Sequence, residues 1–314
     1  MPEWLVERGI GESRAVRAVD GEIVEARILL DGMARAGTRL AARLTAVGPP
    51  AIAEAEGQQY LLPRGARGIS EGAELVVEVT REAIPGAEPW KRPLAAVTQE
   101  SPGSPEPLNA EALPFPADTD RLAQLGWNDL VEEARSGIVR FAGGELRISA
   151  TPAMTLIDVD GYLPARELAV AGASAAARAI LRLDIGGSIG IDLPTAGNKA
   201  ARQEAAAAID HALPQPFERT AVNGFGFVQI VRPRRRASLV ELGQDRAAFE
   251  ARALLRRTAF EPAGAKRLVA HPAVIALLHS RKDWLDDLAR QVGGAVELRA
   301  DTALPMSGGY AETR

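Results

Sequence analysis

The stretch from Thr151 to Leu193 constrains the fold more than any other part of the chain. One apolar run, Met154–Ile157, leads into Asp158, and a second, Ser188–Ile191, leads into Asp192. Between the two runs lies an alanine-rich segment with the composition of a helix. A strand, a helix and a second strand in this order predict a βαβ unit whose two strands are parallel neighbours.

The two aspartates are expected to meet at one edge of this sheet. The carboxyl ends of parallel strands share an edge, and open α/β sheets place their active sites there. Asp158 and Asp192 would repel each other, and a hard divalent cation with oxygen ligands relieves that repulsion. Both are therefore candidate catalytic metal ligands for Mg²⁺, with Mn²⁺ as the alternative ion. Taken alone, the two residues fit the competing interpretation better, in which aspartates at strand ends form turns or cap helices.

Composition excludes several kinds of site. The chain has 314 residues, enough for two or three domains, and no cysteine, so disulfides and thiol nucleophiles are excluded. With only three histidines as well, we expect no zinc. The net charge of −4 gives no general attraction to nucleic acid, so any RNA contact needs a local basic patch. We expect no membrane span and a cytoplasmic location, because no apolar run has the length of a span or the position of a signal peptide.

The first hundred residues have the pattern of β structure in two blocks. Residues 1–35 contain three short apolar runs, and Asp20-Gly21 between the last two predicts a hairpin turn. Residues 36–100 contain five short β runs broken by turns. Five such runs in about sixty residues predict a small closed barrel such as an OB-fold.

The remaining residues divide into three parts. Residues 101–120 are rich in proline and are interpreted as a linker. Residues 121–240 contain the βαβ unit and form the predicted catalytic α/β domain. Residues 241–314 alternate between helical and strand patterns, which predicts a small C-terminal α/β module.

The segment that contains the two aspartates resembles the ribonuclease E/G family. Residues 153–160 are similar to the family's first catalytic strand, and residues 183–193 are similar to its glycine-glycine turn and second aspartate. Phe225-Gly226, followed by an apolar run and arginines, extends the similarity, as do the Asp20-Gly21 turn and residues 296–301.

The resemblance implies a fold and an activity. The fold would be a mixed α/β multidomain protein with an RNase H-like/DNase-I-like core, with which residues 1–35 pair, and with an inserted OB-type RNA-binding barrel. The activity would be that of a Mg²⁺-dependent endoribonuclease, a phosphodiester hydrolase that cleaves single-stranded RNA in RNA processing or turnover. With this resemblance, metal ligation becomes the preferred role of Asp158 and Asp192. Self-association is implied too, but without zinc, because the two-cysteine link is missing. The family's arginine–threonine pair that senses a 5′-monophosphate is not found between Pro102 and Gly144, so 5′-end sensing is expected to be absent.

Candidate RNA-binding residues lie in the barrel segment and after the last predicted strand of the core. Tyr60 is the plausible base-stacking residue, and Trp90 and Arg92 are further contacts. The others are basic residues that would contact phosphates: Arg81, Lys91, Arg232, Arg234, Arg235 and Arg236. The alternative is a packed barrel and a strand end with solvated charges.

Departures from the family pattern leave a second function open. Asp160 replaces an asparagine, and it would either assist as a third catalytic carboxylate or disturb its neighbours by like-charge repulsion. Gly224 replaces an arginine, Gln229 a glutamate and Ile52 a phenylalanine. The alternative is therefore a catalytically degenerate RNA-binding protein of the same family. A nuclease for DNA is a third interpretation, because a metal–carboxylate site does not itself choose the sugar.

Overall fold

The computed structural model describes residues 3–86 and 91–313, so that Trp90 lies outside the described residues. The chain forms two compact units. Unit 1 comprises Met1–Asp31, Asn109–Val131 and Leu242–Arg314, and unit 2 comprises Gly32–Leu108 and Glu132–Glu241. None of the helices described is both long and apolar enough to span a bilayer. The predicted mixed α/β architecture with several parts is confirmed.

Unit 1 begins with a four-stranded sheet. Its strands are β1 (Trp4–Arg8), β2 (Glu12–Val19), β3 (Glu22–Leu30) and β9 (Ala110–Leu113), in the order β3-β2-β1-β9. Asp20 and Gly21 form the predicted turn between β2 and β3, and both have positive φ, 53° and 82°.

This sheet corrects two predictions. The N-terminal strands do not pair with the sheet that carries Asp158, because they pair with each other and with β9. The proline-rich segment 101–120 is not only a linker, because Ala110–Leu113 within it forms β9, parallel to β1. The alternation of small apolar and polar residues in that short segment was hidden by the prolines around it.

The predicted C-terminal α/β module is present in unit 1. It contains α6 (Arg246–Ala259), β16 (Lys266–Ala270), α7 (Pro272–Ser280), α8 (Lys282–Val292), β17 (Val296–Ala300) and β18 (Tyr310–Thr313). The sheet order is β17-β16-β18, and β18 was not predicted from the sequence. His271 caps α7, where its Nδ1 accepts a hydrogen bond from the backbone N–H of Ala273, as a structural histidine at a helix entry would.

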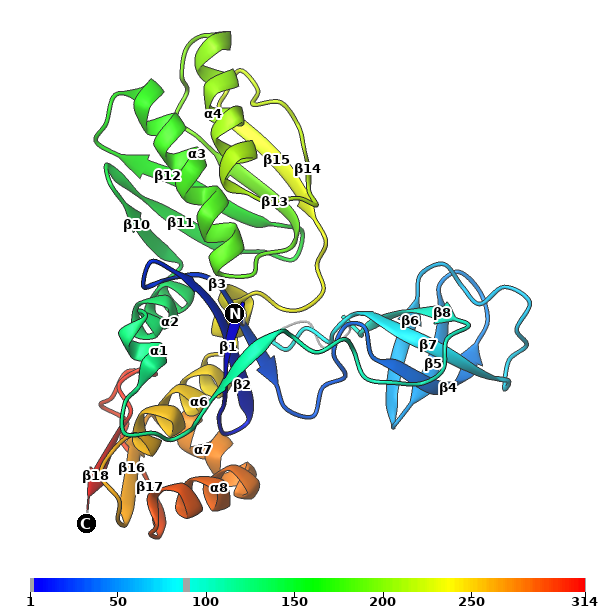
Figure 1. Ribbon diagram of the computed structural model, residues 1–314, viewed down its shortest axis with the longest axis vertical. Helices are drawn as coiled ribbons and strands as arrows, with labels where there is room; N and C mark the ends of the chain where they lie inside the picture. The colour runs from blue at the N-terminus through cyan, green and yellow to red at the C-terminus, as the bar shows by residue number, and fades with distance from the viewer. Residues whose placement is uncertain (1–2, 87–90, 314) are drawn as a thin grey trace. The chain divides into compact units, whose positions relative to one another are not determined.

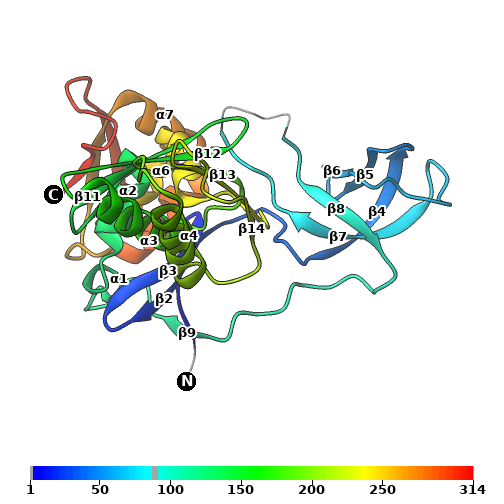
Figure 2. The same cartoon turned by 90° about the horizontal axis from the view of Figure 1, so that it is seen from above.

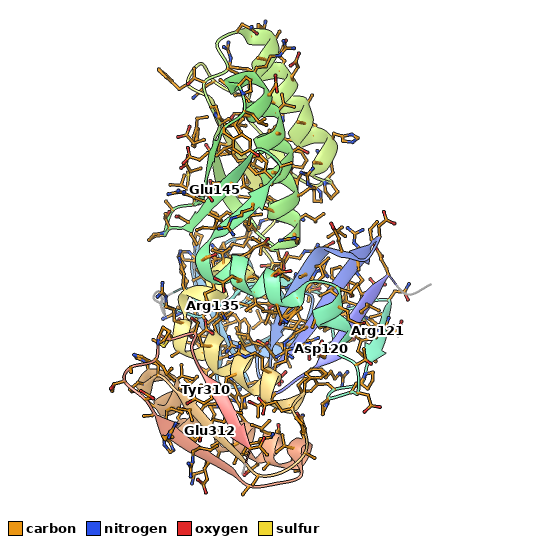
Figure 3. All side chains as sticks on the ribbon, turned by 90° about the vertical axis from the view of Figure 1, so that its left-hand side faces the viewer. Asp120, Arg121, Arg135, Glu145, Tyr310 and Glu312 are labelled. Atoms are coloured by element: carbon orange, nitrogen blue, oxygen red, sulfur yellow. The ribbon has the colours of Figure 1, made fainter. Side chains whose placement is uncertain are left out.

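A buried arginine–carboxylate network connects the parts of unit 1. Arg256 binds both Glu7 and Asp120, with N–O distances of 2.9 and 2.6 Å. Arg14 and Arg252 complete the network through Glu7 and Glu12, each at 2.8 Å. Asp120 also caps α1 (Arg121–Gln124), at whose start Figure 3 shows it. The network therefore ties the N-terminal hairpin to α1, which precedes α2 (Trp127–Ser136), and to α6.

In unit 2, five strands between residues 39 and 98 form a closed barrel (Figure 2). Its strands are β4 (Arg39–Ala46), β5 (Ala51–Ala55), β6 (Gln58–Leu62), β7 (Glu74–Arg81) and β8 (Leu94–Thr98), in the order β4-β5-β6-β8-β7. Alternate apolar side chains point inward and form one core cluster. The prediction of a small closed barrel is confirmed.

The second part of unit 2 is a six-stranded mixed sheet covered on one face by two helices. The strands are β10 (Ile138–Phe141), β11 (Gly144–Ala150), β12 (Thr155–Gly161), β13 (Gly187–Asp192), β14 (Glu218–Arg219) and β15 (Phe227–Arg232), in the order β10-β11-β12-β13-β15-β14. The helices α3 (Ala165–Arg182) and α4 (Lys199–Ala212) lie side by side (Figure 1), and α5 (Leu239–Gln244) follows the sheet. Alanines on α3 and the absence of a side chain at Gly172, which faces Val159, let α3 approach the sheet closely.

Candidate active site

The structure brings Asp158 and Asp192 together as predicted. Strands β12 and β13 are parallel neighbours, and these two aspartates are direct partners in their register. Neighbouring strands lie about 4.8 Å apart, and paired residues point to the same face. Ile157 and Val159 are buried under the helices, whereas Asp158 and Asp192 are exposed on the opposite, open face. The two carboxylates therefore lie next to each other in solvent.

The end of α3 sets where β13 begins. Asp184 has a φ of +53°, and its N–H donates to the Leu181 carbonyl while the N–H of Ile185 donates to the Ile180 carbonyl. This pair of bonds is a Schellman motif, which closes the helix and turns the chain toward the sheet. Gly187 continues the turn with a φ of +86°. The register of Asp192 against Asp158 follows from this short, hydrogen-bonded connection.

One cation lies in the same cross-strand row as the aspartates. Arg147 on β11 is the register partner of Asp158, and it is exposed and bound to Glu145 with an N–O distance of 3.0 Å. Sequence reasoning missed Arg147. The signal was present, because Glu145, Arg147 and Ser149 alternate with the apolar residues of a strand that forms a hairpin with β10. A guanidinium beside two carboxylates can bind a phosphate oxygen.

The donor set suits a hard divalent cation. Within the described part of the chain, neither Asp158 nor Asp192 takes part in an ion pair, so both keep their oxygen lone pairs. Mg²⁺ commonly uses one or two carboxylates and retains several waters, which an exposed face allows. The residues present therefore fit Mg²⁺ or Mn²⁺, and Asp158 and Asp192 would hold it. No group of three acidic, histidine or cysteine side chains that could share an ion is found among the described residues.

Asp160 lies on the same open face, two residues beyond Asp158. Its register partner is Glu145, so it extends the line of carboxylates toward the edge of the sheet. With Arg140 and Tyr162 it lines a shallow depression of about 450 Å³. This placement is compatible with an assisting carboxylate, and its role remains a prediction.

The neighbouring strand β15 supplies a polar and an aromatic residue. Gln229 is the register partner of Gly190, and its Nε2 donates to Ser188 Oγ at 3.0 Å. Phe227 is the register partner of Asp192. A side chain at Gly190 would collide with the Phe227 ring, since a Cβ there would be 2.6 Å from its Cζ. Gly190 therefore leaves the space that the ring occupies on the open face.

Tyr60 is buried in the barrel and is not available to stack on RNA, which corrects that prediction. Its side chain is only 2% exposed and belongs to the barrel core. Burial, and secondarily the charge of Glu56, raises the pKa of its hydroxyl. The alternation of β6 places Tyr60 and Leu62 inside and Leu61 between them outward, so the ring packs rather than binds.

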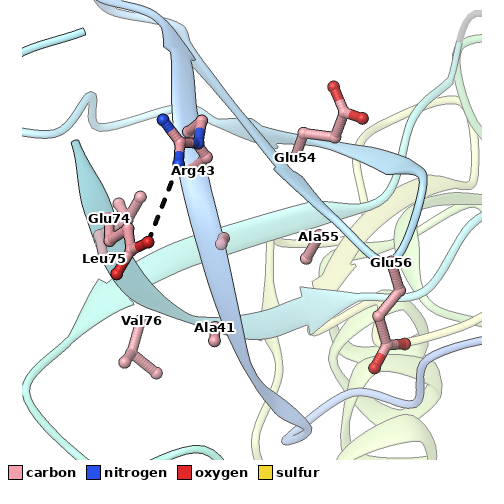
Figure 4. A pocket seen from close by; sticks show the side chains of 9 residues that line it. Ala41, Arg43, Glu54, Ala55, Glu56, Glu74, Leu75 and Val76 are labelled. Atoms are coloured by element: carbon pink, nitrogen blue, oxygen red, sulfur yellow. Dashed lines mark ion pairs between the residues drawn. The ribbon is translucent and has the colours of Figure 1, made fainter. Parts of the chain in front are cut away.

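One depression on the barrel is acidic. It has a volume of about 520 Å³ and is lined by small side chains, with Glu54, Glu56, Glu74 and Arg43 around them (Figure 4). Arg43 pairs with Glu74 at 3.8 Å. The uncompensated carboxylates would repel a phosphate backbone, so this depression does not supply the predicted RNA contact.

The predicted basic residues next to the barrel are partly occupied. Arg81 donates to the Arg92 carbonyl at 2.7 Å, and Lys91 donates to the Pro152 carbonyl at 3.2 Å. Burial and then the nearby charge of Arg234 lower the pKa of Arg81. Both side chains thus contact backbone of unit 2, which leaves their RNA contact a prediction.

The arginine run does not lie beside the aspartates. Asp192 pairs with Phe227, whereas Gly187 at the other end of β13 pairs with Arg232. Five residues of extended strand separate these two ends by about 17 Å. Arg232 itself is half-buried and donates to the Ile185 carbonyl.

Two of the four arginines form internal ion pairs. Arg234 binds Glu241, and Arg236 binds Asp184 at 2.9 Å and Glu82 at 3.5 Å. Burial alone would lower the pKa of Arg236, but the charge of Asp184 and then that of Glu82 raise it. Arg235 is exposed and has no side-chain partner among the described residues. Of the run, only Arg235 has the free guanidinium that phosphate binding requires.

Arg236→Gln is expected to lower the stability of unit 2 by about 2–3 kcal/mol, because it leaves two largely buried carboxylates without their cation. Burial already raises the pKa of Glu82, so the deficit should shrink as the pH falls and Glu82 takes up a proton. Thermal melting followed by circular dichroism would measure it. Arg235→Gln is the matched control and should melt like the wild type; equal losses in both variants would contradict the assignment.

The structure thus assembles Asp158, Asp192 and Asp160 on one open face, adds Arg147 and Phe227 to it, and separates the arginine run from it. The sequence finds no match among family models or among curated proteins.

Proposed function

We propose that this protein is a metal-dependent endoribonuclease that cleaves single-stranded RNA. The observation that carries the proposal is the register of Asp158 and Asp192 on the open face of the six-stranded sheet. In this proposal the sheet with α3 and α4 is the RNase H-like core, and the closed barrel is of the OB type. The resemblance of the two aspartate segments to the ribonuclease E/G family supports both assignments.

The residues of the chain have separate tasks. Asp158 and Asp192 would hold Mg²⁺, which when bound activates water and stabilises charge that develops on the phosphorus. Arg147 would bind a non-bridging oxygen of the scissile phosphate from the adjacent strand. Asp160, on the same face, would accept a proton or a hydrogen bond from the attacking water. Arg235 would bind the phosphate backbone of the RNA at a distance from the aspartate pair.

Cleavage of an internally labelled single-stranded RNA tests the proposal. Asp158→Asn and Asp192→Asn are each expected to lower the rate on the order of a thousandfold, because each removes half of the charge that holds the cation. EDTA should abolish cleavage by the wild type. Asp286→Asn, at an exposed aspartate of α8, is the control for purification and charge and should leave the rate unchanged. Full cleavage by Asp192→Asn would refute the proposal.

The alternative, an RNA-binding relative without activity, is favoured by one observation. Gln229 replaces the glutamate of the family pattern, and its Nε2 donates to Ser188 Oγ, so this position adds no carboxylate to the site. Retained RNA affinity without cleavage under any divalent cation would support this alternative. The surroundings of Gly224 are open, so Gly224→Arg is sterically acceptable. Its cleavage rate would test whether the missing arginine explains the absence of RNA cleavage in this alternative.

A further inference from the structure

Phe225 is an exposed aromatic side chain next to the aspartate pair. It is 84% exposed, although a phenylalanine normally gains from burial. It lies in the turn that precedes Phe227, the register partner of Asp192. No residue of the described chain covers this ring, so it is available to a ligand.

The turn that presents Phe225 is fixed by hydrogen bonds on both sides. The backbone N–H groups of Phe225 and Phe227 donate to Asn223 Oδ1 at 2.9 and 3.0 Å. Thr195 Oγ1 donates to the Phe225 carbonyl at 3.2 Å, which joins the turn to the segment after Asp192. The ring is therefore displayed from a braced backbone rather than from a loose loop, and its ordering cost on binding is small.

The open face carries further apolar side chains next to the turn of Phe225. The Phe227 ring lies over Gly190, and Leu156 lies against the same glycine from the other side. Leu156 is 40% exposed. The apolar floor is thus bordered by Asp158 and Asp192, and it is far smaller than the about 800 Å² per partner of a protein interface.

We propose that Phe225, with the Phe227–Leu156 floor, is a stacking site for an unpaired nucleobase next to the phosphodiester held at Asp158 and Asp192. This inference rests on the proposed function and names the element that fixes the base. A flat π face stacks on any base, so the site would favour single strands over duplexes without selecting sequence. It would also supply the aromatic contact that the barrel, with Tyr60 buried, does not.

Binding of a fluorescein-labelled single-stranded RNA of about 12 nucleotides, measured by anisotropy in EDTA, tests the site. Phe225→Ala is expected to weaken binding about tenfold, and Phe225→Trp should bind like the wild type. An oligonucleotide whose central positions are abasic should bind both Phe225→Ala and the wild type equally weakly. The control is Tyr310→Ala, which replaces a different exposed aromatic side chain, one in unit 1. It should leave the RNA affinity unchanged.

Three outcomes would overturn the inference. The first is equal RNA affinity of Phe225→Ala and the wild type. The second is a loss of affinity on Phe225→Ala that is the same for abasic and normal RNA, and the third is no binding of any oligonucleotide. Because the measurement is made without a divalent cation, it does not depend on cleavage. Base-dependent binding by a protein that never cleaves would refute the proposed activity and keep the stacking site. If Phe225→Ala leaves both the cleavage rate and the RNA affinity unchanged, the stacking site is refuted and the proposed activity is kept.

Discussion

Replacing Arg256 by methionine is expected to destabilise unit 1 by about 3–5 kcal/mol, because it leaves buried carboxylates without their cation. The guanidinium donates to both oxygens of Glu7 and both oxygens of Asp120, at 2.6–3.1 Å. Arg256 and Glu7 are 4% and 2% exposed, so water cannot take over these bonds. Glu7 also binds Arg14, which is equally buried, and one substitution therefore disturbs the whole network.

Urea unfolding followed by tryptophan fluorescence measures this loss, since Trp4, Trp127 and Trp284 all lie in unit 1. The matched control is Arg290→Met, at an arginine that is 75% exposed and pairs with Asp287 on its own helix. Such a surface pair contributes about 0–1 kcal/mol. Equal transitions for Arg256→Met and Arg290→Met would contradict a stabilising role for the network.

The same network gives unit 1 an acid-sensitive component. Burial would raise the pKa of Asp120, but the hydrogen bonds from Arg256 and Ala123 outweigh it and lower that pKa. The stability from Asp120 is therefore present above the ordinary aspartate pKa of about 3.9 and is lost as the pH falls through the lower folded value. Arg256→Met should flatten this part of the pH dependence.

Gly226→Ala is expected to destabilise the candidate site by about 3 kcal/mol or more. Gly226 has a φ of +95°, which L residues rarely adopt, and a Cβ there would be 2.0 Å from the Leu193 carbonyl oxygen. Leu193 directly follows Asp192, and its N–H donates to the Gly226 carbonyl. The clash would push the end of β13 away from β15, so the aspartate pair and the turn of Phe225 should both loosen.

The control for this substitution lies two residues away. Gly224 has an ordinary φ and open space around it, so Gly224→Ala should change stability by less than about 0.5 kcal/mol. Circular dichroism melting compares the two variants. If Gly226→Ala melts at the same temperature as Gly224→Ala, the turn accommodates the added side chain at little cost. The rigidity inferred for the turn of Phe225 would then be wrong.

Local patterns predicted the parts of the fold that depend on nearby residues. The apolar runs before Asp158 and Asp192, with a helix between them, fixed two parallel strands, and their pairing is confirmed. The Asp20-Gly21 turn and the five short strands of the barrel are confirmed for the same reason. In each case the turn residues and the spacing leave few alternatives.

Features that depend on distant partners were not predictable. Arg236 appeared to be part of a free basic run, but its partners are Asp184 and Glu82, far away in the sequence. Tyr60 appeared to be a surface aromatic because a strand of five residues gives only a weak sign of which face is inside. The pairing of β9 with β1 likewise joins segments about a hundred residues apart.

A cysteine at position 192 tests the central claim most directly, since the chain contains no other cysteine. A thiolate is a poor ligand for Mg²⁺ and a good one for soft ions. If Asp192 holds the catalytic cation, Asp192→Cys should fail to cleave single-stranded RNA in Mg²⁺ and should regain part of its activity when Cd²⁺ is added. Asp286→Cys should cleave normally in Mg²⁺. Undiminished cleavage by Asp192→Cys in Mg²⁺ alone would contradict the account.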